Sequence, residues 1–223
     1  FDLRTFSFDR KNALLPDGDA WAVGGQLRYG SGDWNGFSVE AAWYNSTELD
    51  ANGAPTGLLT AENENINVLG EANLSYAFEQ GMLEGSELTL YRQKLSLPYL
   101  NTEDSRMLPS THEGYMLQRA GSGLDYVLGH ITKFKERSDD EFRYLSEVAG
   151  AQGTDKGLTL AGTQVSLSER LTVGAINQYG WDTFNTLYSE TSYSNSLSEG
   201  VDLRFSGQYT NQRSVGDELL GSF

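Results

Sequence analysis

The residues best suited to bind a charged group lie close together in one polar stretch, TEDSRM at residues 102–107. A guanidinium that is held in place can bind a carboxylate through two parallel hydrogen bonds, which a flexible ammonium does less well. Arg106 could bind a solute in this way. It could instead pair with Glu103 or Asp104 and only hold its own loop in shape. The sequence leaves both roles open.

Two prolines, Pro98 and Pro109, bracket this stretch. Proline lacks the backbone donor that a sheet ladder needs, so the pair marks a long excursion from strand pairing within residues 92–117. Loops of this length inside a compact sheet are usually functional or disordered. The concentration of charged side chains favours a functional loop.

The segments around this loop alternate apolar and polar residues with a period of two, as strands do. Residues 20–30 are the clearest case, with Trp21, Leu27 and Tyr29 on one face and Arg28 on the other. We predict roughly eleven strands of this kind, many of them as long as a tilted transmembrane strand. They cover residues 1–10, 20–30, 37–44, 67–78, 86–95, 115–117, 124–135, 158–167, 171–179, 184–192 and 201–210.

Two of these strands carry specific expectations about their faces. In residues 67–78, Val68 and Leu74 fall on one apolar stripe, with Glu71 on the opposite face. In residues 86–95 the phase is unresolved, because both parities mix apolar and polar residues. A bulge would resolve that conflict.

The connections between strands are also predictable in part. Asn35-Gly36 is a strong hairpin signal. Residues 45–64 are polar and glycine-bearing, which indicates an extended surface loop. Residues 136–157 form a charged loop in which we expect a short helix at 141–148. Short turns therefore alternate with longer loops, as in outer-membrane barrels.

Composition excludes several classes of function. The 223 residues carry a formal net charge of -15, which argues against a nucleic-acid partner because phosphate binding depends on clustered Lys and Arg. With no cysteine there is no disulfide framework and no thiolate metal site. The two histidines lack metal-ligand spacing, and no catalytic signature is present. We predict no metal, no cofactor and no enzymatic activity.

The polar faces of the predicted strands favour a barrel with a wet interior. Arg4, Glu40, Glu71, Asp202 and Arg204 would be costly inside a dry core unless each were paired. In a water-filled lumen they would be well solvated. The alternative is a soluble β-sandwich that binds a carbohydrate or another ligand, with the polar faces turned to solvent and aromatic residues stacking on sugars. A barrel enzyme is a third option.

Three stretches resemble the OprD-type outer-membrane porins. Residues 92–117 contain a run similar to the family's LPY-N-x-x-DSRM-x-P, in a loop that folds toward the lumen. Residues 128–151, LGHITKFKERSDDEFRYLSEVAGA, are similar to a strand followed by K-x-R…F-x-x-L-S-x-x-A-G. Residues 171–190 share a Gly-Ala-Ile step and an Asp…Asn-Thr…Tyr run. The opening LRTFSFDR and the GGQLRYGSG strand also look like the family's first strands, so the matching stretches follow the expected order along most of the chain.

The resemblance implies an all-β fold, an antiparallel transmembrane barrel of eighteen strands in the outer membrane of a Gram-negative bacterium. Residues 1–223 would form a single barrel domain, matching roughly the first eleven strands and incomplete at its C-terminal end. Family members are often trimers and pass small solutes by passive diffusion, with a preference for those bearing a carboxylate. The partners expected are therefore such solutes, the lipid bilayer and lipopolysaccharide.

The resemblance also implies roles for individual residues. Arg106, with Asp104 and Ser105 beside it, would form part of the pore constriction. A ladder of inward-facing cations would guide the solute carboxylate, and its members here would be Arg4, Arg28, Arg92, Lys94 and Arg204. Each of these could instead be held in a salt bridge to Glu40, Glu71 or Asp202. Lys133, Lys135 and Arg137 are expected near lipid headgroups or lipopolysaccharide phosphates.

Overall fold

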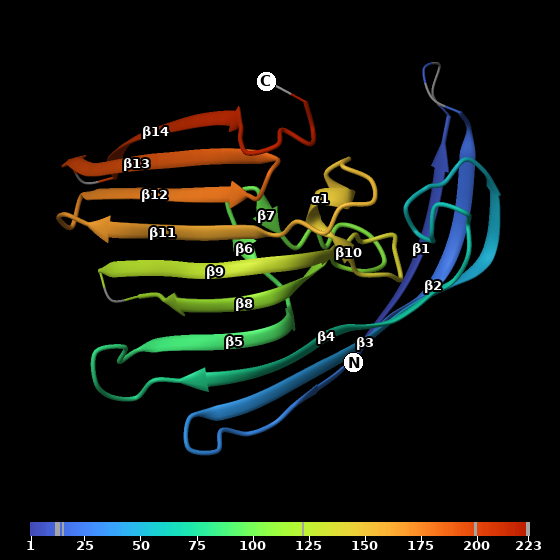
Figure 1. Cartoon of the computed structure of the whole chain (residues 1–223), viewed down its shortest axis with the longest axis horizontal. Coiled ribbons are helices and arrows are strands. Elements are labelled where there is room, and N and C mark those ends of the chain that lie inside the picture. The colour runs from blue at the N-terminus through green and yellow to red at the C-terminus, as the bar shows by residue number, and fades with distance from the viewer. Residues whose placement is uncertain (12–13, 15, 122, 199, 222–223) are drawn as a thin grey trace. The chain divides into compact units, whose positions relative to one another are not determined.

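The computed structural model describes residues 1–11, 14, 16–121, 123–198 and 200–221, and within them nearly all of the regular secondary structure is β-strand (Figure 1). The strands are β1 (Asp2–Arg10), β2 (Gly18–Gly30), β3 (Phe37–Gly53), β4 (Ile66–Ala77), β5 (Ser86–Gln93), β6 (Ser96–Leu97), β7 (Leu100–Asn101), β8 (Thr111–Arg119), β9 (Leu124–Lys135), β10 (Arg143–Tyr144), β11 (Leu158–Ser166), β12 (Leu171–Gly180), β13 (Phe184–Ser198) and β14 (Val201–Ser214). One short helix, α1, spans Leu145–Val148. Among the described residues, no helix is long and apolar enough to cross a membrane.

The main sheet has 12 strands, and its order follows the chain: β1-β2-β3-β4-β5-β8-β9-β11-β12-β13-β14, with β10 paired to β9. The pairings are antiparallel wherever a register is defined, as in Phe6 opposite Ala22 and Tyr193 opposite Phe205. Short turns at residues 31–36 and 167–170 alternate with long connections at residues 54–65, 94–110 and 136–157. This is the expected all-β antiparallel meander.

The chain separates into two compact units. The first contains Phe1–Ser75, Leu90–Gly114 and Lys133–Arg143, and the second contains Tyr76–Thr89, Tyr115–Thr132 and Tyr144–Phe223. Each unit has its own arrangement of covered and exposed faces.

In the first unit, two loops cover one face of β2, β3 and β4. Small side chains on that face, such as Ala22 and Ala42, leave room for Leu58 of one loop and for Met107 and Leu108 of the other, and all of these residues are buried. The opposite face exposes large apolar side chains, namely Trp21, Leu27, Tyr29, Phe37, Val39 and Trp43. An exposed apolar face of this kind is typical of a surface that contacts lipid or another protein.

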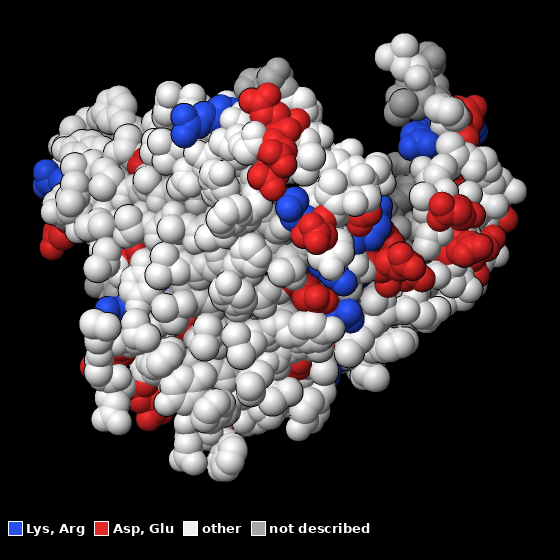
Figure 2. Space-filling model, in the orientation of Figure 1, with Lys and Arg blue, Asp and Glu red and all other residues white. Residues whose placement is uncertain are grey.

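In the second unit, β13 and β14 separate polar and apolar side chains by parity. Ser192 pairs with Ser206 on the polar face, and Tyr193 pairs with Phe205 on the apolar face. Phe205 is exposed. The side of the sheet seen in Figure 2 is largely uncharged over β9, β11 and β12.

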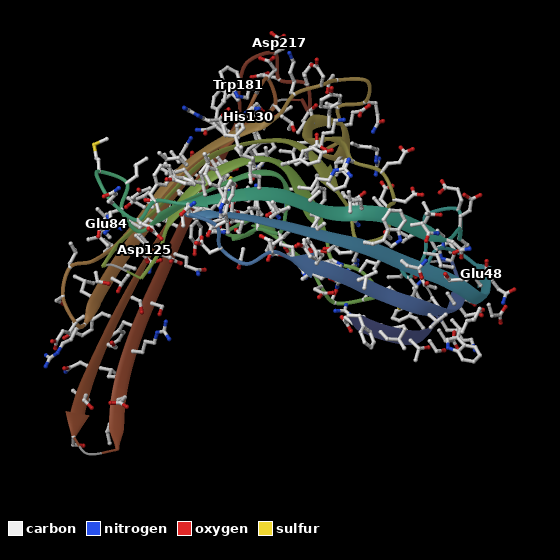
Figure 3. The ribbon with its side chains drawn as sticks, turned by 90° about the horizontal axis from the view of Figure 1, so that it is seen from below. Glu48, Glu84, Asp125, His130, Trp181 and Asp217 are labelled. Atoms are coloured by element: carbon white, nitrogen blue, oxygen red, sulfur yellow. The ribbon has the colours of Figure 1, made fainter. Side chains whose placement is uncertain are left out.

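The apolar side of the second unit also carries an aromatic and polar cluster. Thr159 accepts a hydrogen bond from the Nε1 of Trp181 at 2.9 Å, and its Oγ1 lies 2.9 Å from the Nδ1 of His130. Figure 3 shows His130 and Trp181 on the same side of the ribbon. Aromatic side chains with a polar tip are typical of membrane–water interfaces.

Several local expectations were wrong. The strand β3 continues to Gly53, where a surface loop was expected from residue 45, because Asn45–Gly53 pairs with β2 from Gly25 back to Gly18. The helix is shorter than expected, since Arg143 and Tyr144 pair with β9 as β10. Backbone pairing overrides the weak β-propensity of these polar residues.

The expected phase of β4 was wrong in its first half. Val68 is buried among the core residues of the first unit and does not share the exposed face of Leu74. Glu71 is buried as well, so alternation breaks between Val68 and Glu71. In β5 the backbone is irregular at Tyr91, whose φ of 83° lies in the left-handed region, and burial does not alternate strictly along the strand. The bulge suggested for this strand stays a prediction.

Candidate functional site

The loop that carries Asp104 is fastened to β1 by Arg4. The Nη1 of Arg4 lies 2.5 Å from one Asp104 carboxylate oxygen and its Nη2 lies 3.0 Å from the other, a bidentate pair. Nη1 also donates to the carbonyl of Arg106 at 3.0 Å, and Asp2 pairs with Arg4 at 2.6 Å. This predicted ladder residue is therefore occupied in anchoring the loop.

Within the same loop, Arg106 is turned away from its acidic neighbours. Its Nη1 donates to the carbonyl of Thr56, and its guanidinium lies 4.3 Å from the ring centroid of Phe8. Burial, together with the nearby cations Arg137 and Arg10, lowers the pKa of Arg106 below its ordinary value. Arg106 thus lies in an electropositive environment.

The acidic residues around Arg106 are paired elsewhere. Glu103 pairs with Arg137 at 3.5 Å, and the Oγ of Ser105 accepts a hydrogen bond from Arg137 at 2.9 Å. Asp104 pairs with Arg4. Among the described residues, neither Glu103 nor Asp104 holds Arg106, because Glu103 pairs with Arg137 and Asp104 pairs with Arg4. The structure therefore does not support the alternative in which one of these two acids fixes Arg106.

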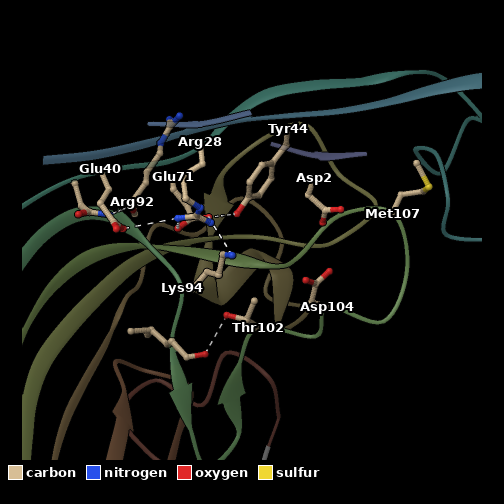
Figure 4. Close-up of polar contacts among 12 residues, drawn as sticks. Asp2, Arg28, Glu40, Tyr44, Glu71, Arg92, Lys94, Thr102, Asp104 and Met107 are labelled. Carbon is tan, nitrogen blue, oxygen red and sulfur yellow. Dashed lines mark hydrogen bonds and ion pairs between the residues drawn. The ribbon is translucent and has the colours of Figure 1, made fainter. Parts of the chain in front are cut away.

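A second polar cluster lies on the covered face of the first unit and centres on Glu71 (Figure 4). Its carboxylate receives two hydrogen bonds from Arg28, at 2.8 and 2.5 Å, and a third from the hydroxyl of Tyr44. The Nζ of Lys94 lies 3.3 Å from the same carboxylate. Glu40 is 3.7 Å from Arg28. The predicted ladder residues Arg28 and Lys94 thus converge on one acid.

Arg92 is the next predicted cation of the ladder. It pairs with Glu113 at 3.3 Å, donates to the carbonyl of Leu69 at 3.0 Å, and stacks over Phe142 at 4.0 Å from the ring centroid. A guanidinium with a flat apolar partner and an ion pair is held in one orientation.

Lys135 corrects an expectation. It was expected near lipid headgroups, but it is fully buried, and its Nζ donates to the carbonyls of Glu136 and Asp139 at 2.8 and 3.3 Å. The same ammonium lies 5.5 Å from the ring centroid of Tyr44. Strand parity places Lys135 on the covered face, with carbonyl oxygens in place of water. Arg137, which was also expected near lipid headgroups, instead donates a hydrogen bond to Ser105 in the loop that carries Arg106.

Arg204 lies in the second unit and is not placed relative to the other cations. Its Nε donates to the Oγ of Ser192 at 3.2 Å. A shallow hollow around it is lined by hydroxyl, amide and carboxylate groups of β11–β14, including Gln164, Glu190 and Gln208. The face around Arg204 is therefore polar, with both signs of charge.

Sequence reasoning missed the part that Tyr44 plays in this site. The signal in the sequence was the glycine at position 70, inside a predicted strand. In the structure a Cβ atom at Gly70 would lie 2.2 Å from the Cδ2 of Tyr44. Glycine there allows the ring to lie flat against β4 with its hydroxyl on Glu71. Phe8 and Thr56 were missed because nothing local in the sequence links them to Arg106. Among the described residues, no group of three or more His, Asp or Glu is placed to hold a metal ion.

An antiparallel meander with an exposed apolar face, and with clusters of paired charges on its covered face, is the class of wall that transmembrane β-barrels have. A protein-family model, outer membrane porin of the OprD family, matches residues 1–223. The chain belongs to this family, whose members are porins of the outer membrane of Gram-negative bacteria. The soluble β-sandwich alternative was wrong, because the strands form one principal sheet with an apolar exposed face.

Solved structures share the fold. OccK9 (OpdG) of Pseudomonas aeruginosa superposes with a TM-score of 0.81 at 24% identity, over 99% of this chain and 59% of that one. OpdK of the same organism, solved with vanillate, gives 0.79 at 21% identity over 99% and 58%. A BenF-like porin of Pseudomonas fluorescens gives 0.80 at 18% identity over 99% and 58%. The chain thus spans less than two thirds of these relatives' length. No curated protein sequence matched it.

Proposed function

We propose that this chain forms part of a passive, substrate-selective diffusion channel for small solutes that carry a carboxylate. The observation that carries the proposal is the state of Arg106. Its guanidinium is oriented by the Thr56 carbonyl and the Phe8 ring and has Arg137 and Arg10 as charged neighbours. Thr56 is its one hydrogen-bond acceptor among the described residues, so most of its five N–H donors stay available to a solute.

The rest of the expected ladder supports the same function more indirectly. Arg28, Arg92 and Lys94 lie in one unit with Arg106, and each is oriented by an acidic partner while remaining partly exposed. Cations arranged in this way attract an anion without holding it too tightly, which conduction requires. Vanillate, present in the OpdK structure, is itself a carboxylate. No cofactor or energy source is required.

We also propose that the strands belong to a single barrel domain and that the protein assembles as a trimer in contact with lipid and lipopolysaccharide. Family membership supports this arrangement, and so does the exposed apolar face around Trp21 and Trp43. A channel rather than an enzyme is proposed, because the family consists of porins. Chemical cross-linking in native membranes would show a trimer as a band at three times the monomer mass.

Single-channel recording in planar bilayers tests the role of Arg106. Arg106→Ala should weaken the preference for carboxylates by about 1 kcal/mol or more, roughly five-fold in affinity, because a charge-assisted hydrogen-bonding group is lost. Arg106→Lys is the matched control, since it keeps the charge but loses the planar pair of donors. We expect an intermediate effect for this variant with benzoate, and little effect with chloride.

Two results would contradict the proposal in different ways. Wild-type channels whose carboxylate preference is the same in Arg106→Ala would leave a channel but assign Arg106 to loop structure alone. Failure of the complete natural polypeptide to form any channel would overturn the diffusion function itself.

A further inference from the structure

Among the described residues, Glu71 is the most deeply buried acid on the covered face of the first unit. Its side chain is 3% exposed, although aspartate and glutamate are almost never this buried unless paired. Its partners come from three separate parts of the chain: Arg28 on β2, Tyr44 on β3 and Lys94 just after β5. Burying this carboxylate is therefore possible only because these groups converge on it.

The partners of Glu71 are not buried to the same degree. The side chain of Arg28 is 35% exposed and that of Lys94 is 32% exposed. Each cation thus has one side against Glu71 and another side open. At separations of 2.5 and 3.3 Å, a carboxylate offsets much of the field that the two cations would otherwise project. The cluster of Arg28, Lys94 and Glu71 carries one net positive charge in place of two.

We propose that Glu71 is a specificity-determining residue of the channel, because it sets how much positive charge Arg28 and Lys94 present to a passing solute. This inference rests on the proposed diffusion function. Glu71 occupies the place where a solute carboxylate would otherwise bind both cations at once. A solute anion therefore meets two cations whose combined charge is reduced from two to one. This charge is enough to attract the anion and small enough to let it dissociate. The hydroxyl of Tyr44 fixes the carboxylate so that it cannot turn away.

The matched test compares Glu71→Gln with Glu40→Gln. Both changes remove one negative charge beside Arg28, but Glu40 is 49% exposed and lies 3.7 Å from Arg28, whereas Glu71 is 3% exposed and also pairs with Lys94. In a salt gradient across a planar bilayer, the reversal potential reports the ratio of chloride to potassium permeability. We expect Glu71→Gln to raise this ratio roughly two-fold or more, and to lengthen benzoate blocking events, while Glu40→Gln has the smaller effect.

The outcomes separate this inference from the function on which it rests. If the wild type forms no channels, the diffusion function fails before the variants are compared. If it forms channels and Glu71→Gln leaves the permeability ratio unchanged, or changes it no more than Glu40→Gln, the role of Glu71 in specificity is overturned.

A second measurement does not require conduction. Glu71→Ala removes the carboxylate and leaves Arg28, Lys94 and Tyr44 facing an empty space of carboxylate size. Added formate should raise the thermal unfolding temperature of Glu71→Ala in detergent, and it should not raise that of the wild type or of Glu40→Ala. Equal effects of formate on all three proteins would show that these groups do not form a carboxylate pocket, which would overturn the inference.

Discussion

At the scale of single residues, acidic partners hold several of the cations that were expected to line the pore. Arg4 fastens a loop through Asp104, while Arg28 and Lys94 share Glu71. Arg106 differs from these cations, because its described partners are the carbonyl of Thr56 and the ring of Phe8 and include no acid. The net charge of -15 is thus compatible with a positive electrostatic potential around these cations, because a solute responds to the charged side chains nearest to it.

A prediction at this scale concerns Gly70. Replacing it with alanine would place a Cβ 2.2 Å from the Tyr44 ring, and the ring cannot easily move because its hydroxyl is bonded to Glu71. We expect a loss of about 1–3 kcal/mol in the free energy of unfolding, as for other overpacked sites. Urea titration of the refolded protein in lipid vesicles measures it.

Gly174→Ala serves as the control for Gly70→Ala. A Cβ at Gly174 would have as its nearest neighbours the Cγ atoms of Gln164 and Glu190, both at 3.5 Å, which is an ordinary contact. This variant should therefore be as stable as the wild type. Equal stability of Gly70→Ala and Gly174→Ala would mean that Tyr44 is not confined as described.

At the scale of elements, the loop between β5 and β8 is tied to its unit by both charge and apolar contacts. Its own β6–β7 hairpin pairs Ser96 with Asn101, and Met107 and Leu108 enter the core. The two prolines that predicted an excursion lie on either side of the charged stretch. The loop is thus anchored at several points, which the proposed constriction role requires because a constriction must keep a fixed width.

The prediction at this scale concerns the pair of Arg4 and Asp104. Breaking it with Asp104→Asn should loosen one anchor, with a coupling energy of about 0.5–1 kcal/mol in a double-mutant cycle with Arg4→Gln. The pair is partly exposed, which keeps the value small. In single-channel records we expect more frequent open-state fluctuations. If Asp104→Asn, Arg4→Gln and the double variant all fluctuate as the wild type does, the apolar contacts of Met107 and Leu108 are sufficient to hold the loop in place.

At the scale of the whole molecule, each unit turns apolar side chains outward on one face and polar side chains toward the other. Phe205 and Ser206 are neighbours in β14 that point to opposite faces. A soluble protein would bury the apolar face. Here large aromatic residues stay exposed, because the surrounding medium in an outer-membrane barrel is lipid.

This arrangement predicts opposite responses to the same substitution at adjacent positions. Phe205→Arg should cost about 2–4 kcal/mol if the residue lies near the bilayer midplane, since the charge would face lipid. Ser206→Arg should be tolerated. Both variants are refolded into lipid vesicles, and the fraction of folded, heat-modifiable protein is measured for each on a gel. A similar yield for both variants would contradict the assignment of faces.

The sequence by itself determined the class of fold and most of the strands. Period-two alternation is a local property, so residues 20–30 and 201–210 predict their own faces, and Asn35 and Gly36 adopt the positive φ values of 52° and 85° that their hairpin requires. The family resemblance, carried by the loop and strand motifs, was confirmed by the match over residues 1–223. The residue roles in the pore remain predictions.

Only the tertiary structure decided which charges pair. The sequence offered Glu103 and Asp104 as partners for Arg106 because they are close in the chain, but Asp104 pairs with Arg4 across the fold. It placed Lys135 at the lipid surface, whereas the ammonium is buried beneath backbone carbonyls. Pairing depends on which strands and loops are brought face to face, and Coulomb attraction acts over distance in space. That distance is not contained in the local pattern of the chain.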